Sequence, residues 1–179
     1  MQMEAGLDTG PMLLIERLAI EAFDTTTTLT ARLADCGARL IVEALRQAQQ
    51  GQLVPVPQPV DDPAITYAHK LAKEEGQLDL RQPATVLARR VRAFDPYPVA
   101  TLNWRDTALR LWRAEALATP HDAGPGTVLA ADASGVQVQT GAGVLVLTEL
   151  QRAGGKRLPA REFLAGTPIT VGDRLLGAL

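Results

Sequence analysis

Hydrophobic residues in the first part of the chain recur every three or four positions. From about Thr28 to Gln50 this spacing places the apolar side chains on one face of a long helix, which Gly51 would end. Just before it, residues Met12 to Ile20 alternate apolar and polar near their end, a pattern typical of a strand. This stretch therefore predicts a strand followed by a helix. The expected apolar face of that helix consists of Leu29, Leu33, Cys36, Leu40, Ile41, Ala44, Leu45 and Ala48.

A proline-rich segment follows this helix. Pro55, Pro57, Pro59 and Pro63 fall within nine residues. Proline fixes its own backbone angle and cannot donate to a sheet, so the segment is expected to be an extended connector. Such a connector predicts a domain boundary here.

Beyond the connector, the helical pattern returns once. Leu87, Val91 and Phe94 mark the buried face of a helix whose first turn accepts Pro83, and the sequence "DPYP" then stops it.

After that helix, the period shortens to two, which predicts a series of short strands separated by turns. Because closing a sheet on itself removes exposed edges, strands this short and this close together favour a small β-barrel. The expected strands are Val99–Trp104, Ala108–Leu117, Gly126–Ala131, Gly135–Thr140, Val144–Leu150 and Arg174–Leu176, with a short helix at Pro159–Ala165 before the last.

These patterns predict an α+β protein in three parts. Residues 1–51 form a strand and a helix, which cannot close a core without further elements. Residues 52–70 form the linker, and residues 71–179 form the small barrel with short helices.

The composition is that of an ordinary globular protein. Of the 179 residues, 46% are hydrophobic and 21% are charged, which argues against disorder. No apolar run is long enough to cross a membrane. The single cysteine, Cys36, excludes an internal disulfide and fits a reducing compartment. We therefore expect a cytoplasmic protein.

Basic residues gather in the second part of the chain. Residues 1–60 carry a net charge of −3, whereas residues 61–179 carry +1. The clustering favours a polyanionic partner, and scattered solvated charges are an equally simple explanation. Lys70 and Lys73 would share a face if their segment were helical. The other basic candidates are Arg89, Arg90, Arg92, Lys156 and Arg157.

One acidic residue stands out as candidate chemistry. Asp8 lies in the loop Gly-Leu-Asp-Thr-Gly, where it could steer a proton or simply form a turn. Neither His69 nor His121 belongs to a triad or to a metal-ligand spacing, so no metal site is expected. From its residues alone, the chain has no complete active site.

Several motifs together resemble one family. The stretches "MQMEAGLDTGPML", "YAHKLAKEEGQLDL" and "RVRAFDPYPVA", in that order, and the later "PGTVL" and "LPAREFLAG" resemble methionyl-tRNA formyltransferase. Tyr97 and Leu80 stand where that family commonly has tryptophan. The resemblance implies the end of a Rossmann-like catalytic domain at residues 1–51, then the linker, then an OB-like tRNA-binding domain.

The resemblance also implies a function in translation initiation. The family transfers a formyl group from 10-formyltetrahydrofolate to the methionine amino group on initiator tRNA. Asp8 matches the family's catalytic aspartate, whose Asn and His partners come from an upstream motif that has no counterpart here. The chain alone is therefore expected to hold no cofactor and to be inactive, and to bind tRNA chiefly through Lys70, then Lys73.

Three other interpretations of the sequence stay open. The first is a related formyltransferase acting on an amino-sugar nucleotide. The second is a stand-alone RNA-binding module, and the third is an interaction domain in which Asp8 is only a turn. In any of them, the apolar faces of residues 1–51 could pair with a second copy of the chain.

Overall fold

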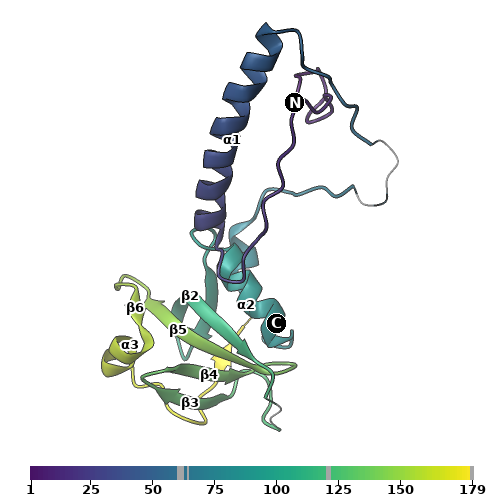
Figure 1. Cartoon of the computed structure of the whole chain (residues 1–179). Coiled ribbons are helices and arrows are strands. Elements are labelled where there is room, and N and C mark those ends of the chain that lie inside the picture. Colours follow the sequence, from purple (N-terminus) through teal and green to yellow (C-terminus); the bar gives the residue numbers. More distant parts are fainter. Residues whose placement is uncertain (60–62, 64, 120–121, 178–179) are drawn as a thin grey trace. The chain divides into compact units, whose positions relative to one another are not determined.

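The structure is a computed structural model that describes residues 1–59, 63, 65–119 and 122–177. The chain divides into two compact units, Met1–Lys70 and Leu71–Leu179 (Figure 1). Part of the proline-rich connector, Val60–Asp62 and Ala64, lies outside the described residues, as does His121.

The first unit is built around one long helix, α1 (Thr26–Gln49). Thr25 caps its start, because its side chain accepts from the Thr28 backbone N–H and the Thr28 side chain accepts from the Thr25 backbone N–H. Gly51 follows the helix with a φ of 67°, a left-handed conformation that glycine adopts without a steric cost. The predicted helix is confirmed.

The strand predicted at Met12–Ile20 is wrong. These residues have no regular structure apart from one antiparallel bridge between Met12 and Val56. A strand is stabilised by a neighbouring strand that pairs its backbone groups, and the described part of this unit supplies only that single partner. An alternating pattern shows which face could be buried, but it does not supply the sheet.

The second unit begins with a short 3-10 helix, η1 (Lys73–Gly76), and the helix α2 (Ala84–Ala93). Pro83 is the N-cap of α2, and Leu87 and Val91 are fully buried on its inner face. Phe94 is the C-cap and is also buried. The predicted second helix is therefore confirmed, together with its buried face.

A curled antiparallel sheet makes up the rest of this unit (Figure 1). The strands are β1 (Ala100–Trp104), β2 (Thr107–Leu117), β3 (Val128–Asp132), β4 (Gly135–Gln139), β5 (Val144–Arg152), β6 (Leu158–Pro159) and β7 (Leu175–Leu176). The short helix α3 (Ala160–Gly166) follows β6. Within the sheet the strand order is β3-β4-β5-β2-β1-β7, and β6 pairs with β5.

The two ends of this sheet meet over a few residues. Thr127 forms an antiparallel bridge with Arg174. The backbone N–H of Val128 donates to the Asp173 carbonyl at 2.9 Å, and that of Leu175 donates to the Gly126 carbonyl at 2.8 Å. The segments beside β3 and β7 therefore satisfy part of each other's edge.

Side chains from α2 and from the concave face of the sheet fill one core. Leu87 and Val91 of α2 belong to the same buried cluster as Leu109 and Leu111 of β2 and Leu147 of β5.

No helix in the described residues is long and apolar enough to cross a membrane.

Candidate nucleic-acid interface

Asp8 lies in a tight turn with its side chain exposed. Its φ is 56°, a left-handed conformation that aspartate tolerates better than most residues. The turn is held through its backbone, because Gln58 Nε2 donates to the carbonyl oxygens of Asp8 and Gly10 at 2.7 Å each. Among the described residues, the Asp8 carboxylate has no hydrogen-bond or ion-pair partner within the first unit.

Lys70 and Lys73 lie on either side of the division between the units. Lys70 is in an irregular segment at the end of the first unit, and Lys73 opens η1. The condition for a shared helical face is therefore not met. Both side chains are exposed, and neither forms an ion pair with any described residue. The nearby Glu75 carboxylate instead accepts from the Ala72 backbone N–H at 2.7 Å.

The three arginines of α2 divide into two groups. Arg89 and Arg92 are three residues apart and share one side of the helix. Each donates to a carbonyl of the preceding turn, Arg89 to Thr85 at 3.1 Å and Arg92 to Ala88 at 3.4 Å. Arg90 points elsewhere, where its charge helps to lower the pKa of Asp79, after the larger effect of hydrogen bonds from Arg81.

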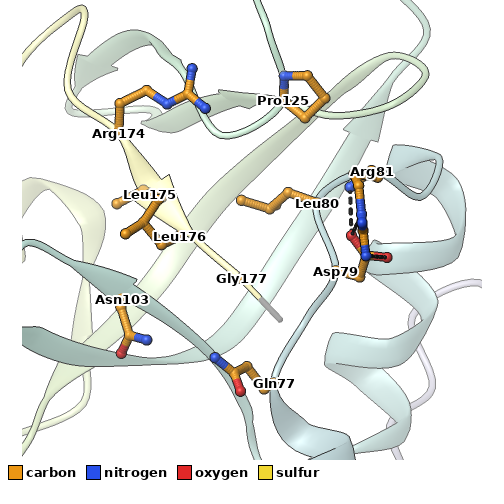
Figure 2. A pocket seen from close by; sticks show the side chains of 10 residues that line it. All are labelled: Gln77, Asp79, Leu80, Arg81, Asn103, Pro125, Arg174, Leu175, Leu176 and Gly177. Atoms are coloured by element: carbon orange, nitrogen blue, oxygen red, sulfur yellow. Dashed lines mark hydrogen bonds and ion pairs between the residues drawn. The ribbon is translucent and has the colours of Figure 1, made fainter. Parts of the chain in front are cut away.

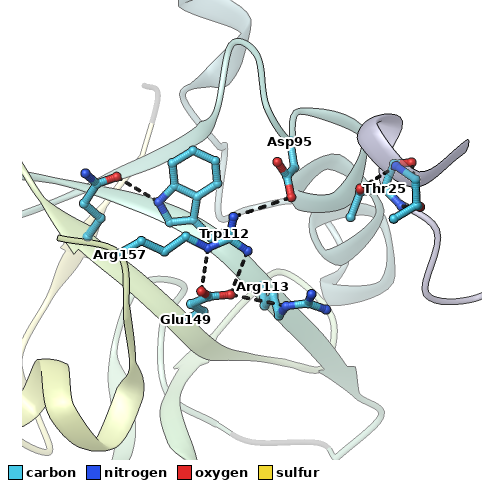
Figure 3. Close-up of polar contacts among 8 residues, drawn as sticks. Thr25, Asp95, Trp112, Arg113, Glu149 and Arg157 are labelled. Atoms are coloured by element: carbon cyan, nitrogen blue, oxygen red, sulfur yellow. Dashed lines mark hydrogen bonds and ion pairs between the residues drawn. The ribbon is translucent and has the colours of Figure 1, made fainter. Parts of the chain in front are cut away.

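Lys156 and Arg157 are neighbours in the turn between β5 and β6, and they differ in environment. Both are exposed, but Lys156 has no ion-pair partner among the described residues. Arg157 makes a two-point contact with Glu149, from Nε at 2.5 Å and from Nη2 at 2.8 Å (Figure 3). Its guanidinium also lies 4.6 Å from the ring centre of Trp112 and 3.9 Å from the Asp95 carboxylate.

Sequence reasoning missed the residues that surround Arg157. Trp112 Nε1 donates to Gln151 Oε1 at 2.9 Å, and Gln151 Nε2 donates to the Gly155 carbonyl at 2.8 Å. Arg113 also contacts Glu149, at 3.2 Å. Together these contacts tie the β5–β6 turn to two strands of the sheet.

A shift in the alternation of β2 was the available signal. Leu111 pairs with Leu150 and Arg113 with Glu149, so Trp112 and Arg113 together oppose one residue of β5. Such a β-bulge redirects a side chain out of the regular pleat. Along β2 the buried positions are Leu109, Leu111 and then Ala114. The inward-facing positions therefore change from odd to even residue numbers at the bulge.

The charges in this cluster shift one another's pKa values. The hydrogen bond from Arg157 lowers the pKa of Glu149 and outweighs the effect of burial, while the same contact raises the pKa of Arg157. Glu149 is therefore held ionised between two guanidinium groups.

A separate groove of about 610 Å³ lies in the second unit (Figure 2). Gln77 and Asn103 stand toward one end, and Arg174 and Pro125 stand toward the other. Arg81 also lines it, but its Nε forms an ion pair with Asp79 Oδ1 at 2.8 Å. Among the described residues, no group of three or more side chains could hold a metal ion.

Comparison with known proteins places this geometry in context. Residues 70–168 match the family model described as formyl transferase, C-terminal domain. The methionyl-tRNA formyltransferase of Burkholderia thailandensis is 54% identical over 175 residues, which cover 97% of this chain and 53% of the relative. That of Acidovorax ebreus is 54% identical over 181 residues, covering 99% and 55%. The chain thus spans about half the length of the curated relatives it matches.

Solved structures support the fold. A variant of HypX from Aquifex aeolicus superposes with a TM-score of 0.65 at 21% identity, over 90% of this chain and 29% of that one. HypX from the same organism in complex with tetrahydrofolic acid gives a TM-score of 0.62 at 21% identity, over 90% and 28%.

Proposed function

Because this chain belongs to the formyl transferase family through its C-terminal domain, we propose that it is the C-terminal half of a methionyl-tRNA formyltransferase. The whole protein then moves a formyl group from 10-formyltetrahydrofolate to the amino group of methionine on initiator tRNA. The nitrogen of the amine attacks the formyl carbon, the bond from that carbon to the folate nitrogen breaks, and the amine's proton ends on the folate nitrogen.

On this proposal the catalytic machinery is incomplete within these residues. Asp8 would orient or tune a histidine, and here its exposed carboxylate has no partner in the first unit as far as the structure describes it. A folate site needs an enclosed, largely apolar pocket with a few converging polar groups, which the exposed Asp8 turn does not resemble. The chain alone is then inactive, and measurable formyl transfer by the purified chain would refute this part of the proposal.

On the same proposal, the linker and the second unit hold the tRNA. The observation that carries this proposal is that Lys70, Lys73 and Lys156 are exposed and without an ion pair among the described residues, within or beside the matched family domain. Uncompensated cations of this kind suit RNA phosphates, and their contribution falls as salt rises. Arg89 and Arg92 extend the basic set on α2.

The finer points of the fold belong to the same proposal. The curled sheet of the second unit is an OB-like barrel, and residues 1–51 are the end of a Rossmann-like domain, with residues 52–70 as the linker. The protein acts in the cytoplasm.

The exposed apolar side chains of α1, among them Leu33, Ile41 and Leu45, support self-association of the chain in the absence of its other half.

Binding of initiator tRNA across a salt series tests the proposal. We expect saturable binding that weakens with salt, with Lys70→Ala reducing the slope of log affinity against log salt by about 0.7–0.9. Arg81→Ala is the matched control, because it removes the same charge from a residue already paired with Asp79. Absence of binding by the unmodified chain at low salt would refute the RNA-holding role.

An equal effect of Lys70→Ala and Arg81→Ala would show that only overall charge matters. Tighter binding of an amino-sugar nucleotide than of tRNA would favour the related sugar-modifying enzymes instead.

A further inference from the structure

The turn between β5 and β6, residues 152–157, combines unpaired cations with attachment to the sheet at two points. Arg152 and Lys156 are exposed, and neither has an ion-pair partner among the described residues. Gly154 takes a φ of 72°, which lets the chain reverse, and the Gly155 backbone N–H donates to the Arg152 carbonyl at 2.9 Å. The turn therefore presents two cations from a short, closed loop.

Arg157 holds this turn from its far end. Its guanidinium makes a two-point hydrogen bond with Glu149, and the face of the group stacks on Trp112. Planar arginine is suited to both contacts at once, whereas lysine can reproduce neither geometry. With Asp95 near the remaining nitrogen, at 3.9 Å, every guanidinium nitrogen has a protein carboxylate nearby, although 35% of the side chain is exposed.

Gln151 holds the middle of the same turn. Its amide nitrogen donates to the Gly155 carbonyl, and its amide oxygen accepts from Trp112. Trp112 reaches this position from a β-bulge opposite Glu149. Two separate contacts thus fix the loop to the sheet at Gly155 and at Arg157.

We propose that residues 152–157 form a preorganised RNA-phosphate contact, in which Arg152 and Lys156 bind the phosphates. Arg157 is a positioning residue in this contact: it fixes the loop and does not itself touch the RNA. The inference rests on the proposed tRNA-holding function. A loop that is already ordered loses less conformational freedom on binding, so the attachment strengthens the contact without adding charge to it.

Glu149 gives the sharpest test, because charge and positioning predict opposite results. Glu149→Gln removes a negative charge and releases Arg157 and Arg113, so electrostatics alone would tighten tRNA binding. Loss of positioning would weaken it, by about three- to tenfold on the scale of a few side-chain rotamers. Glu115→Gln is the matched control, since Glu115 is exposed on β2 and gives the same change in net charge.

The experiment measures dissociation constants for labelled initiator tRNA with the whole chain and both variants, below their melting temperatures. Weaker binding by Glu149→Gln together with equal or tighter binding by Glu115→Gln supports the inference. Binding by Glu149→Gln that is unchanged or tighter overturns it. If Glu149→Gln fails to fold, Gln151→Ala decides, because it loosens the loop at Gly155 with no change in charge and should also weaken binding.

Limited trypsin digestion supplies a readout that does not depend on RNA. Cleavage after Arg152 and Lys156 should be several-fold faster in Glu149→Gln than in the unmodified chain or in Glu115→Gln, because an ordered loop is a poor protease substrate. Equal cleavage rates would overturn the positioning role of the Glu149 contacts. If the unmodified chain binds no tRNA at all, it is the proposed function that fails, and the digestion still reports whether the loop is held.

Discussion

The two units of the chain bury their apolar side chains to very different extents. In the second unit, α2 and the curled sheet enclose a continuous core in which Leu87, Leu111 and Leu147 are at most 1% exposed. In the first unit, Leu33, Ile41 and Leu45 of α1 are 50%, 57% and 64% exposed, and Cys36 is the one buried apolar residue among those described. The amphipathic pattern is as clear in one unit as in the other.

The difference shows that an apolar face becomes a core only when other elements cover it. The second unit supplies that cover itself, because β2 pairs with β1 on one side and β5 on the other while α2 packs across it. The first unit has a well-capped helix, and the rest of this unit, as far as it is described, forms one bridge, between Met12 and Val56. Helical stability in proteins comes mostly from packing, so we expect the helix α1 to be less stable than the helix α2.

The largest expected difference lies between matched leucine truncations. Leu147→Ala opens a cavity in the closed core and should lower the free energy of unfolding by about 2–5 kcal/mol. Leu45→Ala removes an exposed side chain and should change it by less than about 0.5 kcal/mol. Denaturant titration followed by circular dichroism measures both. Similar losses for the two variants would contradict the contrast in packing.

A second comparison uses glycines. A Cβ at Gly141 would lie 1.7 Å from the Arg81 carbonyl oxygen, so Gly141→Ala forces two backbone segments apart. We expect a loss of about 2 kcal/mol in the second unit, within the range for overpacking. Gly166→Ala is the control, because a Cβ there meets nothing within 4 Å in the described part of the chain. Thermal melting of the two variants at matched concentration tests this, and an unchanged midpoint for Gly141→Ala would refute the close approach.

In the first unit, adding a methyl group should have the opposite sign. Gly37 lies inside α1, and a Cβ added there would meet nothing within 4 Å among the described residues. Gly37→Ala should stabilise the helix by about 1 kcal/mol through helix propensity alone. An increase in the far-ultraviolet helical signal, largest near the midpoint of unfolding, is the expected result. A decrease would mean that another surface packs closely against Gly37.

The smallest effect concerns pH. Hydrogen bonds from Arg46 and then Gln47 lower the pKa of Glu43 in α1 from 4.5 to about 2. Because the folded-state pKa is the lower one, this contact stabilises the helix fully above about pH 4.5 and is lost as the pH falls toward 2.

Glu43→Gln should therefore flatten the acid limb of the helical signal. Some dependence of the helical signal on pH should remain from Asp24, whose pKa is lowered chiefly by the hydrogen bond from the Glu21 backbone N–H. An acid limb identical to that of the unmodified chain would show that the contact between Glu43 and Arg46 contributes nothing.

The sequence predicted most of the second unit, because its strands and α2 follow from local periodicity. The burial of Val136 and Val138 in "GVQVQT" could be predicted from its alternation, although the polar Gln139 is buried as well. The burial of Leu87, Val91 and Phe94 likewise needed no knowledge of their partners. The strand at Met12–Ile20 failed for the complementary reason. Pairing is a property of two segments, and an alternating pattern in one of them does not reveal whether the other is present.

For the candidate interface, the sequence predicted basic residue types but not the contacts that each one makes. Charge alone grouped Lys156 with Arg157, whereas the structure gives Arg157 a carboxylate and an aromatic partner. Glu149 lies eight residues before Arg157 and meets it only because β5 turns back into β6. Such a pairing depends on the hairpin and on the bulge at Trp112, so residue type alone could not show which of the two cations is paired.

The order in which the strands appear along the chain has a consequence for synthesis. The ribosome finishes β1 at Trp104, but the strand that pairs with its outer edge, β7, does not begin until Leu175. At about 5–20 residues per second, a ribosome takes about 4–14 s to make the intervening segment. Thr101 on this edge already pairs with Gln77, so during that interval only the end of the edge, at Asn103 and Trp104, is open to other nascent chains. Chaperone dependence of this domain should therefore track translation speed between β1 and β7.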